Sequence, residues 1–421
     1  MKILHVADFL PGFHKTLGGA EFAALRTIEE QQQRGVDVDI ATLRFDAETV
    51  ARDSDRPDQI GNLDRFAPGP AYVIKQLFYP GDPIAACALT RIIGRKQPDV
   101  IHFHNLHFSG LSTVLAAART GIPVAMTIYD YWLFCPSFML LTNKNELCQQ
   151  GHGAHCVDCV GTRRAAMLRP LKRLGFAMRP RVFGQVRNAV DAFITLSSAS
   201  GRLLTQHGVD EKKVHAIHQP VWQQAVAAGE AGPATLGRLL YVGWVEARKG
   251  LHIAIEALAK VASEFSELKL DVLGMAANTA YEQEIRDLIQ RLGLQDRVNF
   301  LGQQSRDGLL EALQDAFLVL VPEQWENMSP VIVTEAMAAG ACVLASRVGG
   351  IPEFVIDGES GLLAERADAA AFAAQIRYAM ANPLTVETMR RAARQRAQKV
   401  FDPGELHQQH LDVYRRLTGA N

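Results

Sequence analysis

The sequence predicts an α/β protein built from two doubly wound parallel sheets. The chain has 421 residues, more than one hydrophobic core usually serves, and 48% of them are hydrophobic. Short apolar runs alternate with longer helical patterns along almost its whole length, as in parallel sheets whose strands are joined by helices. One stretch rich in Ala and Gly, 219–237, interrupts the alternation. We therefore expect two Rossmann-like domains that face a central cleft, joined by a linker at 219–237.

The N-terminal domain, 1–218, is expected to contain six strands. Each is a short apolar run that a helical pattern or a turn follows. The runs span 2–7, 36–43, 100–104, 123–128, 192–196 and 214–217.

The C-terminal domain, 238–402, repeats the pattern with five candidate strands. They span 238–242, 268–273, 298–301, 317–321 and 342–345. The helix after the first strand has a buried stripe, because Leu251, Ile255 and Leu258 recur at spacings of four and three. After Arg366 the pattern is helical to the end of the chain.

The charge balance and the N-terminus exclude some classes of protein. Lys and Arg (44) nearly equal Asp and Glu (45), so net charge gives no support for nucleic-acid binding. About five apolar residues precede Asp8, too few for a signal peptide or a membrane span, and no later segment approaches 18 uninterrupted apolar residues. We expect a cytoplasmic protein with its six cysteines reduced.

The most informative stretch is 322–340, PEQWENMSPVIVTEAMAAG. It follows an apolar run, 316–321, that is expected to be a strand buried on both faces, and it continues into a helix at 331–339 that Gly340 ends. In a parallel sheet, ligands bind at this carboxyl edge. Glu335 can accept hydrogen bonds from a ligand's hydroxyls, while the loop before the helix offers N–H groups to an anion. A polyhydroxylated, phosphorylated ligand would suit both.

This stretch resembles the signature of the family-4 glycosyltransferases, retaining sugar-nucleotide enzymes of the GT-B fold, in which seven residues separate two glutamates. Trp325 and the prolines on either side of it match a common form of the motif. A gapless alignment from Glu335 gives the place of the first glutamate to Asn327, with Glu326 one position earlier. Either Glu326 reaches the ligand through a local bulge, or an amide replaces the carboxylate. A plain polar turn is the third interpretation.

Two further loops resemble family segments that hold the donor's diphosphate. Gly18 and Gly19 open the first helix, where two glycines allow close approach of the backbone to a phosphate, although any tight strand-to-helix turn favours glycine. The loop 243–250, GWVEARKG, resembles a pattern of Gly-Arg, four residues, then Lys-Gly, in which Arg and Lys clamp the diphosphate. Lys249 fits this role, while the arginine position holds Trp244 and leaves Arg248 as the nearest substitute. An ordinary solvated pair is the alternative for these two cations.

The segment 127–136, TIYDYWLFCP, resembles a family segment that reads Thr-x-His-Asp-Tyr-Trp, whose histidine lies near the reacting sugar. Here Tyr129 replaces that histidine, and a phenol with its ordinary pKa near 10 is no base at neutral pH. Asp130 is retained as a contact to the acceptor hydroxyl. Four polar residues at the end of the preceding strand are candidates to replace the imidazole: His102, His104, Asn105 and His107.

The resemblance covers most of the chain and is strongest over 243–361. The segments 298–302, 348–353 and 357–361 also resemble family sequence, the first of them at the nucleotide base. The resemblance further implies that the C-terminal helix, 403–421, crosses back onto the N-terminal domain, which would hold the acceptor.

Four cysteines share an insertion at 135–159 that some family members also carry. A structural zinc site is one interpretation, because Cys156 and Cys159 have the spacing of half a zinc knuckle. Reduced cysteines that pack in the insertion are the other. The transfer itself would need no cofactor. The four residues are Cys135, Cys148, Cys156 and Cys159.

The segment 161–190 has eight basic residues and no acidic one, interleaved with large apolar side chains. This composition suits the surface of an anionic membrane, and equally a solvated helix face.

Together these features predict a retaining glycosyltransferase that moves a hexose from a nucleoside diphosphate sugar to a saccharide or polyprenyl-linked acceptor in bacterial polysaccharide assembly. It would be cytoplasmic, with peripheral contact at the inner face of the membrane, and would not bind nucleic acid. The alternative is a GT-B scaffold that has lost catalysis and serves as a binding subunit. Under the first hypothesis, the candidate catalytic residues are Tyr129, Asp130, Lys249, Glu326 and Asn327, and those that bind the donor are Gly18, Gly19, Arg248, Lys249 and Glu335.

Overall fold

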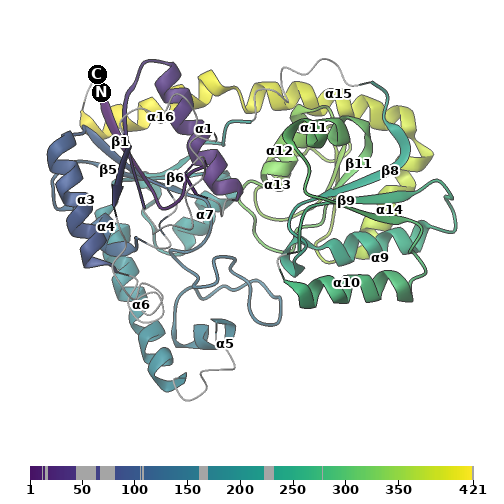
Figure 1. Cartoon of the computed structure of the whole chain (residues 1–421), viewed down its shortest axis with the longest axis horizontal. Helices are drawn as coiled ribbons and strands as arrows, with labels where there is room; N and C mark the ends of the chain where they lie inside the picture. The colour runs from purple at the N-terminus through teal and green to yellow at the C-terminus, as the bar shows by residue number, and fades with distance from the viewer. Residues whose placement is uncertain are drawn as a thin grey trace. The chain divides into compact units, whose positions relative to one another are not determined.

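The structure is a computed structural model of the chain, and it describes residues 1–11, 13–14, 18–43, 63–66, 81–104, 106, 109–160, 169–221, 232–276 and 278–419. The chain divides into two compact units (Figure 1). Unit 1 consists of Met1–Pro220 together with Pro403–Asn421, and unit 2 of Val221–Asp402.

Unit 1 is built on a parallel sheet of seven strands in the order β3-β2-β1-β4-β5-β6-β7. Neighbouring strands pair in parallel throughout. The strands are β1 (Lys2–Ala7), β2 (Asp37–Leu43), β3 (Leu63–Phe66), β4 (Val100–Phe103), β5 (Val124–Ile128), β6 (Ala192–Thr195) and β7 (Val214–Ala216). Strand β3 was not expected from the sequence, because its short run, LDRF, mixes charged with apolar residues.

Helices flank this sheet, and the last helix of the chain is one of them (Figure 1). They are α1 (Gly19–Gln33), α3 (Pro83–Lys96), α4 (Leu111–Ala118), α6 (Arg169–Ala189), α7 (Ser198–Gln206) and α16 (Pro403–Thr418). The short helix α5 (Val157–Val160) lies at the end of the cysteine insertion and contacts α6. The start of α3 shows how the sequence sets such boundaries. The Asp82 side chain accepts hydrogen bonds from the N–H groups of Ile84 and Ala85, both at 3.0 Å, and Pro83 occupies the first turn.

Helix α16 packs on the sheet of unit 1 through its apolar face. Leu406 and Val413 join a buried cluster with residues of β6, while Tyr414 packs against Ile3 of β1 and Val100 of β4. Residues far apart in the sequence therefore share one core.

Unit 2 contains a parallel sheet of six strands in the order β10-β9-β8-β11-β12-β13. The strands are β8 (Thr235–Val242), β9 (Lys269–Leu273), β10 (Val298–Gly302), β11 (Ala316–Val321), β12 (Val343–Ser346) and β13 (Leu362–Ala364). The flanking helices are α9 (Leu251–Val261), α10 (Thr279–Arg291), α11 (Arg306–Asp315), α12 (Val331–Ala338), α13 (Ile351–Phe354), α14 (Ala369–Ala381) and α15 (Pro383–Val400). The prediction of two doubly wound parallel sheets is confirmed.

Strand β11 is buried along its whole length, and its two faces enter different cores. Leu318 and Leu320 join the cluster that contains α9 and α14, whereas Val319 and Val321 join the one that contains α12 and α15. A continuous apolar run is what a strand covered on both faces requires.

Strand β8 begins inside the segment expected as the linker. Thr235 already pairs with Ala316 of β11, and the register then shifts before Leu239 pairs with Leu318. Gly237 lies in this irregular stretch with φ of +80°, so the glycine that indicated a linker instead marks a bulge. Residues 222–231 of the expected linker lie outside the described residues.

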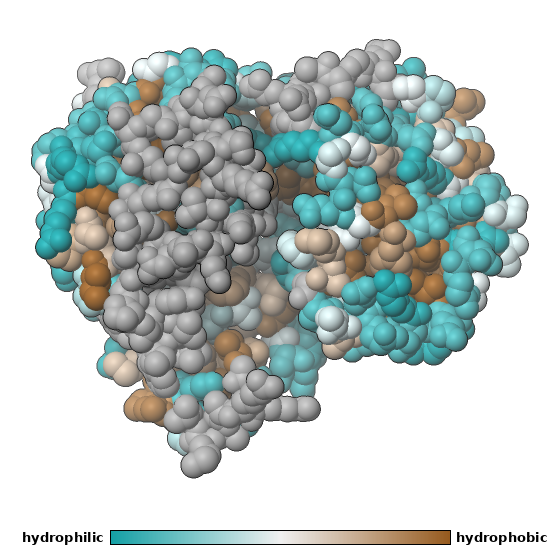
Figure 2. Space-filling model, viewed as in Figure 1, coloured by the Kyte–Doolittle hydropathy of each residue, from teal (hydrophilic) through white to brown (hydrophobic). Residues whose placement is uncertain are grey.

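The distribution of hydrophobic residues agrees with these buried cores. On the face shown in Figure 2, the described surface is mainly hydrophilic, and apolar residues form smaller patches within it. Within the described part of the chain, no helix is long and apolar enough to cross a membrane.

Candidate functional site

The loop between β11 and α12 is organised around Glu323, a carboxylate that is only 1% exposed. Its Oε1 accepts hydrogen bonds from Lys249 Nζ at 2.5 Å and from Asn327 Nδ2 at 3.0 Å. Its Oε2 accepts one from Trp325 Nε1 at 2.6 Å. A buried carboxylate is stable only with such partners. Glu323 therefore holds Lys249, Trp325 and Asn327 at one place on the carboxyl edge of the unit 2 sheet.

Sequence analysis did not single out Glu323, although one signal pointed to it. The residue lies two positions after a strand buried on both faces, where a carboxylate that finds no cation would cost several kcal/mol. Lys249, in the loop after β8, supplies that cation, and its side chain stays 19% exposed. Lys249 is thus not an ordinary solvated cation.

Glu326 and Asn327 bind a second loop, 348–350. The N–H of Gly349 donates to Glu326 Oε2 at 2.9 Å, and the N–H of Gly350 donates to the Asn327 carbonyl, also at 2.9 Å. Gly349 has φ of +57°, and a Cβ there would lie 2.1 Å from the Asn327 carbonyl oxygen. Gly349 is therefore needed for this close approach, and both candidate residues lie at the same loop contact.

Arg248 also lies against this loop. Its guanidinium lies over the Trp325 ring, 5.2 Å from the centroid, and pairs with Glu246 at 2.5 Å. The Gln324 N–H donates to the Arg248 carbonyl at 2.8 Å. Gly250, with φ of +75°, passes so close to the loop that a Cβ would lie 1.9 Å from the Pro322 carbonyl oxygen.

Trp244 occupies the arginine position of the family pattern and is 41% exposed. Its carbonyl accepts a hydrogen bond from the Tyr241 hydroxyl at 2.9 Å. Here the loop after β8 runs beside the loop after β9, since the Val245 N–H donates to the Met275 carbonyl at 2.9 Å. The tryptophan thus leaves an apolar side chain partly exposed in the loop after β8.

Glu335 is the fifth residue of α12 and is 8% exposed. The helix begins directly after Pro330 and ends at Ala338, two residues before Gly340, which has φ of +79°. The predicted helix at 331–339 is therefore confirmed within one residue. The structure brings Arg248, Lys249, Glu326 and Asn327 together around the loop that leads into this helix, and the ligand roles of all five residues stay predictions.

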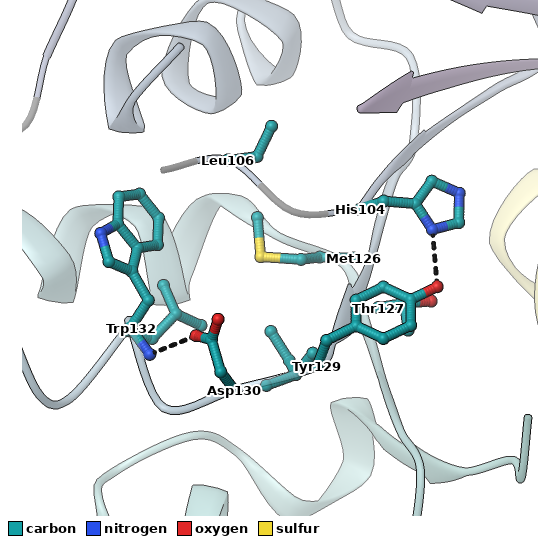
Figure 3. A pocket seen from close by; sticks show the side chains of 9 residues that line it. His104, Leu106, Met126, Thr127, Tyr129, Asp130 and Trp132 are labelled. Atoms are coloured by element: carbon teal, nitrogen blue, oxygen red, sulfur yellow. Dashed lines mark hydrogen bonds between the residues drawn. The ribbon is translucent and has the colours of Figure 1, made fainter. Parts of the chain in front are cut away.

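Tyr129 and Asp130 line a pocket in unit 1, at the carboxyl end of β5 (Figure 3). The pocket leaves about 20 Å³ for the centres of water molecules, roughly room for one. The Tyr129 hydroxyl lies 3.0 Å from His104 Nδ1, and burial raises the pKa of Tyr129 above its ordinary value. The Trp132 N–H donates to Asp130 Oδ1 at 2.8 Å, so this carboxylate also shapes the turn after β5.

Gly18 and Gly19 lie at the start of α1, after the carboxyl end of β1. The Gly18 N–H donates to Glu21 Oε2 at 2.8 Å, so the first turn of the helix satisfies one of its own N–H groups. Glu21 is near enough to Tyr129 for its charge to raise the tyrosine's pKa. The two family-like segments of unit 1 therefore share one edge of the sheet.

His102 lies on β4 and His104 follows it, and of these two candidates His104 contacts Tyr129. Among the described residues, His5, His102 and His104 are the one group of potential metal ligands whose donor atoms all lie within 4.8 Å of one another. Asn105 and His107, the other candidates, lie outside the described residues.

The four cysteines of the insertion lie in one region. Cys135 and Cys156 are buried, and Cys148 and Cys159 are half-buried. Burial is the main cause that raises the pKa of Cys156 to about 11, and the charges of the other three cysteines contribute to this rise. As they lie, these described thiols do not converge within 4.8 Å as the histidines do, and the zinc site stays a prediction.

Most of the basic segment is the helix α6, since residues 161–168 lie outside the described part of the chain. Phe176, Phe183 and Val186 are on its buried face. Leu171, Leu174 and Met178, at spacings of three and four, are more than half exposed. This apolar stripe on an otherwise basic helix is unusual for a face that only meets water.

Two family models match the chain in succession. Residues 17–221 match "Glycosyltransferase Family 4", and residues 231–399 match "Glycosyl transferases group 1". A glycogen synthase of Mycobacterium tuberculosis is 30% identical over 217 residues, which is 50% of this chain and about half (51%) of that protein. A D-inositol 3-phosphate glycosyltransferase of Acidothermus cellulolyticus is 27% identical over 405 residues, 89% of this chain and 81% of that protein.

Solved structures share the fold over nearly the whole chain. The complex of Anabaena Alr3699/HepE with UDP has a TM-score of 0.68 at 18% identity and covers 98% of this chain and 99% of its own. TarM has a TM-score of 0.71 at 12% identity, with 98% and 99% covered. With two family models that match successive segments and two doubly wound sheets, the chain belongs to the family-4 glycosyltransferases of the GT-B fold.

Proposed function

We propose that this protein is a retaining glycosyltransferase that moves a hexose from a nucleoside diphosphate sugar to a saccharide or lipid-linked saccharide, in bacterial polysaccharide assembly. The observation that supports it most is the cluster around Glu323, which holds Lys249 at the carboxyl edge of the unit 2 sheet beside the start of α12. The HepE structures contain UDP and UDP-glucose, which supports a donor of this class.

In this proposal, unit 2 binds the donor. Lys249 stabilises the negative charge that builds on the departing diphosphate, the kind of electrostatic effect that often dominates catalysis. Glu323 keeps the ammonium group in place, and Arg248, held over Trp325, provides a second cation. Glu335 accepts hydrogen bonds from the ribose hydroxyls. Glu326 or Asn327 contacts the sugar.

Unit 1 brings the acceptor. Gly18 and Gly19 lie near the diphosphate and Tyr129 and Asp130 near the reacting carbon. The raised pKa of Tyr129 keeps its phenol neutral at physiological pH, so this residue orients a substrate and does not remove a proton. Glycosyltransferases of this family typically need no cofactor, and none is invoked.

Helix α6 would dock on an anionic membrane when the acceptor is lipid-linked, at the inner face where such acceptors are extended. Its exposed apolar stripe, Leu171, Leu174 and Met178, is flanked by the exposed Arg173 and Arg181. Apolar insertion and attraction of arginines to anionic headgroups then act together. Co-sedimentation with anionic vesicles that weakens in Leu174→Glu supports the docking, and equal binding to neutral vesicles opposes it.

The transfer is tested by a radiolabelled-donor assay with membrane extract, after a thermal-shift screen of nucleotide sugars. Glu335→Ala should weaken donor binding, and Lys249→Ala should mainly lower kcat. The matched controls are Glu311→Ala and Lys260→Ala, exposed residues of the same two types in unit 2. Kinetics unchanged by the first pair would reject the site, and donor binding without transfer or hydrolysis would favour the non-catalytic scaffold.

A further inference from the structure

Seven side chains of unit 1 form an open hydrogen-bonded ring, a group that the glycosyltransferase motifs do not contain. Five of them lie in helices or strands, and the other two, His104 and Tyr129, directly follow a strand. The members are Gln31 of α1, His5 of β1, His102 and His104 at β4, Thr127 and Tyr129 at β5, and Tyr414 of α16. All except the half-buried Tyr129 are at most 4% exposed.

One branch of the ring runs from Gln31 to the pocket. His5 Nε2 lies 3.0 Å from Gln31 Oε1, and His5 Nδ1 lies 2.9 Å from His104 Nε2. His104 Nδ1 lies 3.0 Å from the Tyr129 hydroxyl (Figure 3).

The second branch runs from Gln31 through the C-terminal helix. Gln31 Nε2 donates to the Tyr414 hydroxyl at 3.2 Å, and that hydroxyl lies 2.7 Å from His102 Nδ1. His102 Nε2 lies 2.7 Å from Thr127 Oγ1. Thr127 and Tyr129 are thus the two ends of an open ring. Thr127, Tyr129 and His104 line the pocket of Figure 3.

Chemistry then determines which atom donates in each bond. A carboxamide oxygen only accepts, so His5 must carry its proton on Nε2. Burial keeps His5 neutral, hence its Nδ1 has no proton and must accept from His104 Nε2. His104 is neutral for the same reason, so its Nδ1 accepts and the Tyr129 hydroxyl donates.

In the second branch, each group donates to the next member, from Gln31 towards Thr127. Because Gln31 donates to the Tyr414 oxygen, the hydroxyl proton of Tyr414 is available for His102 Nδ1. The proton of the neutral His102 is then on Nε2 and is donated to Thr127. Each of the five members between Tyr129 and Thr127 donates once and accepts once, an arrangement in which hydrogen bonds strengthen one another.

The same three histidines could in principle hold a metal, but their geometry favours the ring. All six ring nitrogens lie within 3.0 Å of a protein partner. The planes of His5 and His104 are only 22° apart, in a stacked arrangement, whereas ligands of one ion point towards a common centre.

We infer that this ring commits the Tyr129 proton to His104, so that the Tyr129 oxygen meets a ligand only as a hydrogen-bond acceptor. The ligand atom at this position must then be a donor, a saccharide hydroxyl, and cannot be a phosphate or carboxylate oxygen. The identity of that ligand rests on the proposed function, whereas the direction of the ring does not. Gln31, His5, His102 and Tyr414 act on the ligand only through Tyr129 and are positioning residues.

Nitrogen-15 NMR of the full chain labelled in its histidines tests the direction of the ring. We expect His5, His102 and His104 to be neutral at pH 7 with the proton on Nε2. His410 is the internal reference for the opposite tautomer, because its Nδ1 donates to the Leu406 carbonyl at 2.8 Å. Single substitutions of each histidine assign the signals. A proton on Nδ1 of His5 or His104, or a charged imidazole at either, would overturn the inference.

The role of the ring in positioning is tested with Tyr414→Phe, which removes one hydroxyl far from the ligand. We expect a change in the His102 and His104 signals and a fall in kcat/KM for transfer of about tenfold, with donor affinity unchanged. The matched control is Tyr281→Phe, which removes a Tyr–His contact of 2.8 Å to His252 in unit 2 and should alter neither.

These readouts separate failure of the inference from failure of the proposed function. If the wild-type chain shows no transfer but the expected tautomers, the ring stands and the transferase proposal falls. If the wild-type chain shows transfer but the opposite tautomers, the transferase proposal stands and the inference about the ring falls. The wild-type spectrum decides the direction even where a substitution prevents folding.

Discussion

Acid should destabilise unit 1 more than unit 2, because unit 1 buries neutral histidines. Burial lowers the pKa of His5 and of His410 to about 4, and that of His102 and His104 well below the ordinary value of 6.5. The unfolded chain therefore binds more protons than the folded one below pH 6.5. The folding stability is fully present above that pH and is lost as the pH falls towards 4.

The size of this effect follows from the two pKa values. For a histidine at 6.5 unfolded and about 4 folded, the free energy of unfolding falls by about 2 kcal/mol between pH 7 and pH 5. His5 and His410 together contribute about 4 kcal/mol, and His102 and His104 act in the same direction. This corresponds to a fall in Tm of roughly 10 °C. Of the 13 histidines, only His252 lies in unit 2, so that unit should change less.

Differential scanning calorimetry at pH 7, 6 and 5, with hydrogen exchange to assign each transition to a unit, measures the effect. His410→Gln should reduce the pH dependence of unit 1 by about 2 kcal/mol, and His252→Gln should leave it unchanged. A unit 1 Tm that is the same at pH 7 and pH 5, or a slope in His410→Gln equal to that of the wild type, would refute the reasoning. Most carboxylates titrate below this window.

Three further outcomes are expected. Gly250→Ala should destabilise unit 2 by more than about 3 kcal/mol in urea unfolding, because its Cβ would lie 1.9 Å from a backbone oxygen, whereas Gly293→Ala, with φ of +67° but open space, should cost about 1 kcal/mol. Glu323→Gln removes the ion pair with Lys249 and should cost unit 2 about 2 kcal/mol and raise the donor KM; unchanged stability and KM would contradict this. If the insertion binds zinc, protein purified without added metal should contain about one equivalent, lost in Cys156→Ser; less than a tenth of an equivalent in the wild type removes the proposal.

Local sequence predicted the elements whose signals are local. The run 316–321 became β11 without change, and α12 ended where Gly340 permits the left-handed turn. Strands β3 and β13 were missed because they are short, four and three residues, and are defined by the neighbour with which they pair. The hydrophobic periodicity of a segment does not predict the strand with which it pairs.

The candidate site was predictable only in part, for the same reason. Resemblance to the family could locate Lys249 and the loop at 326–327, but the buried partner Glu323 became evident only when β8 and β11 lay side by side. The ring in unit 1 is even harder to predict from the sequence. Gln31 and Tyr414 are separated by 383 residues, and no spacing rule relates positions so far apart.

The place of α16 has a consequence for the order in which the protein can mature. The ribosome completes 1–220 before it begins 221–402, and at 5–20 residues per second this second stretch takes roughly 10–40 s. Throughout that interval, His102 and Gln31 lack the hydroxyl of Tyr414, and the apolar strand residues beneath the helix remain open to water. Unit 1, although first to be synthesised, is the last to be finished.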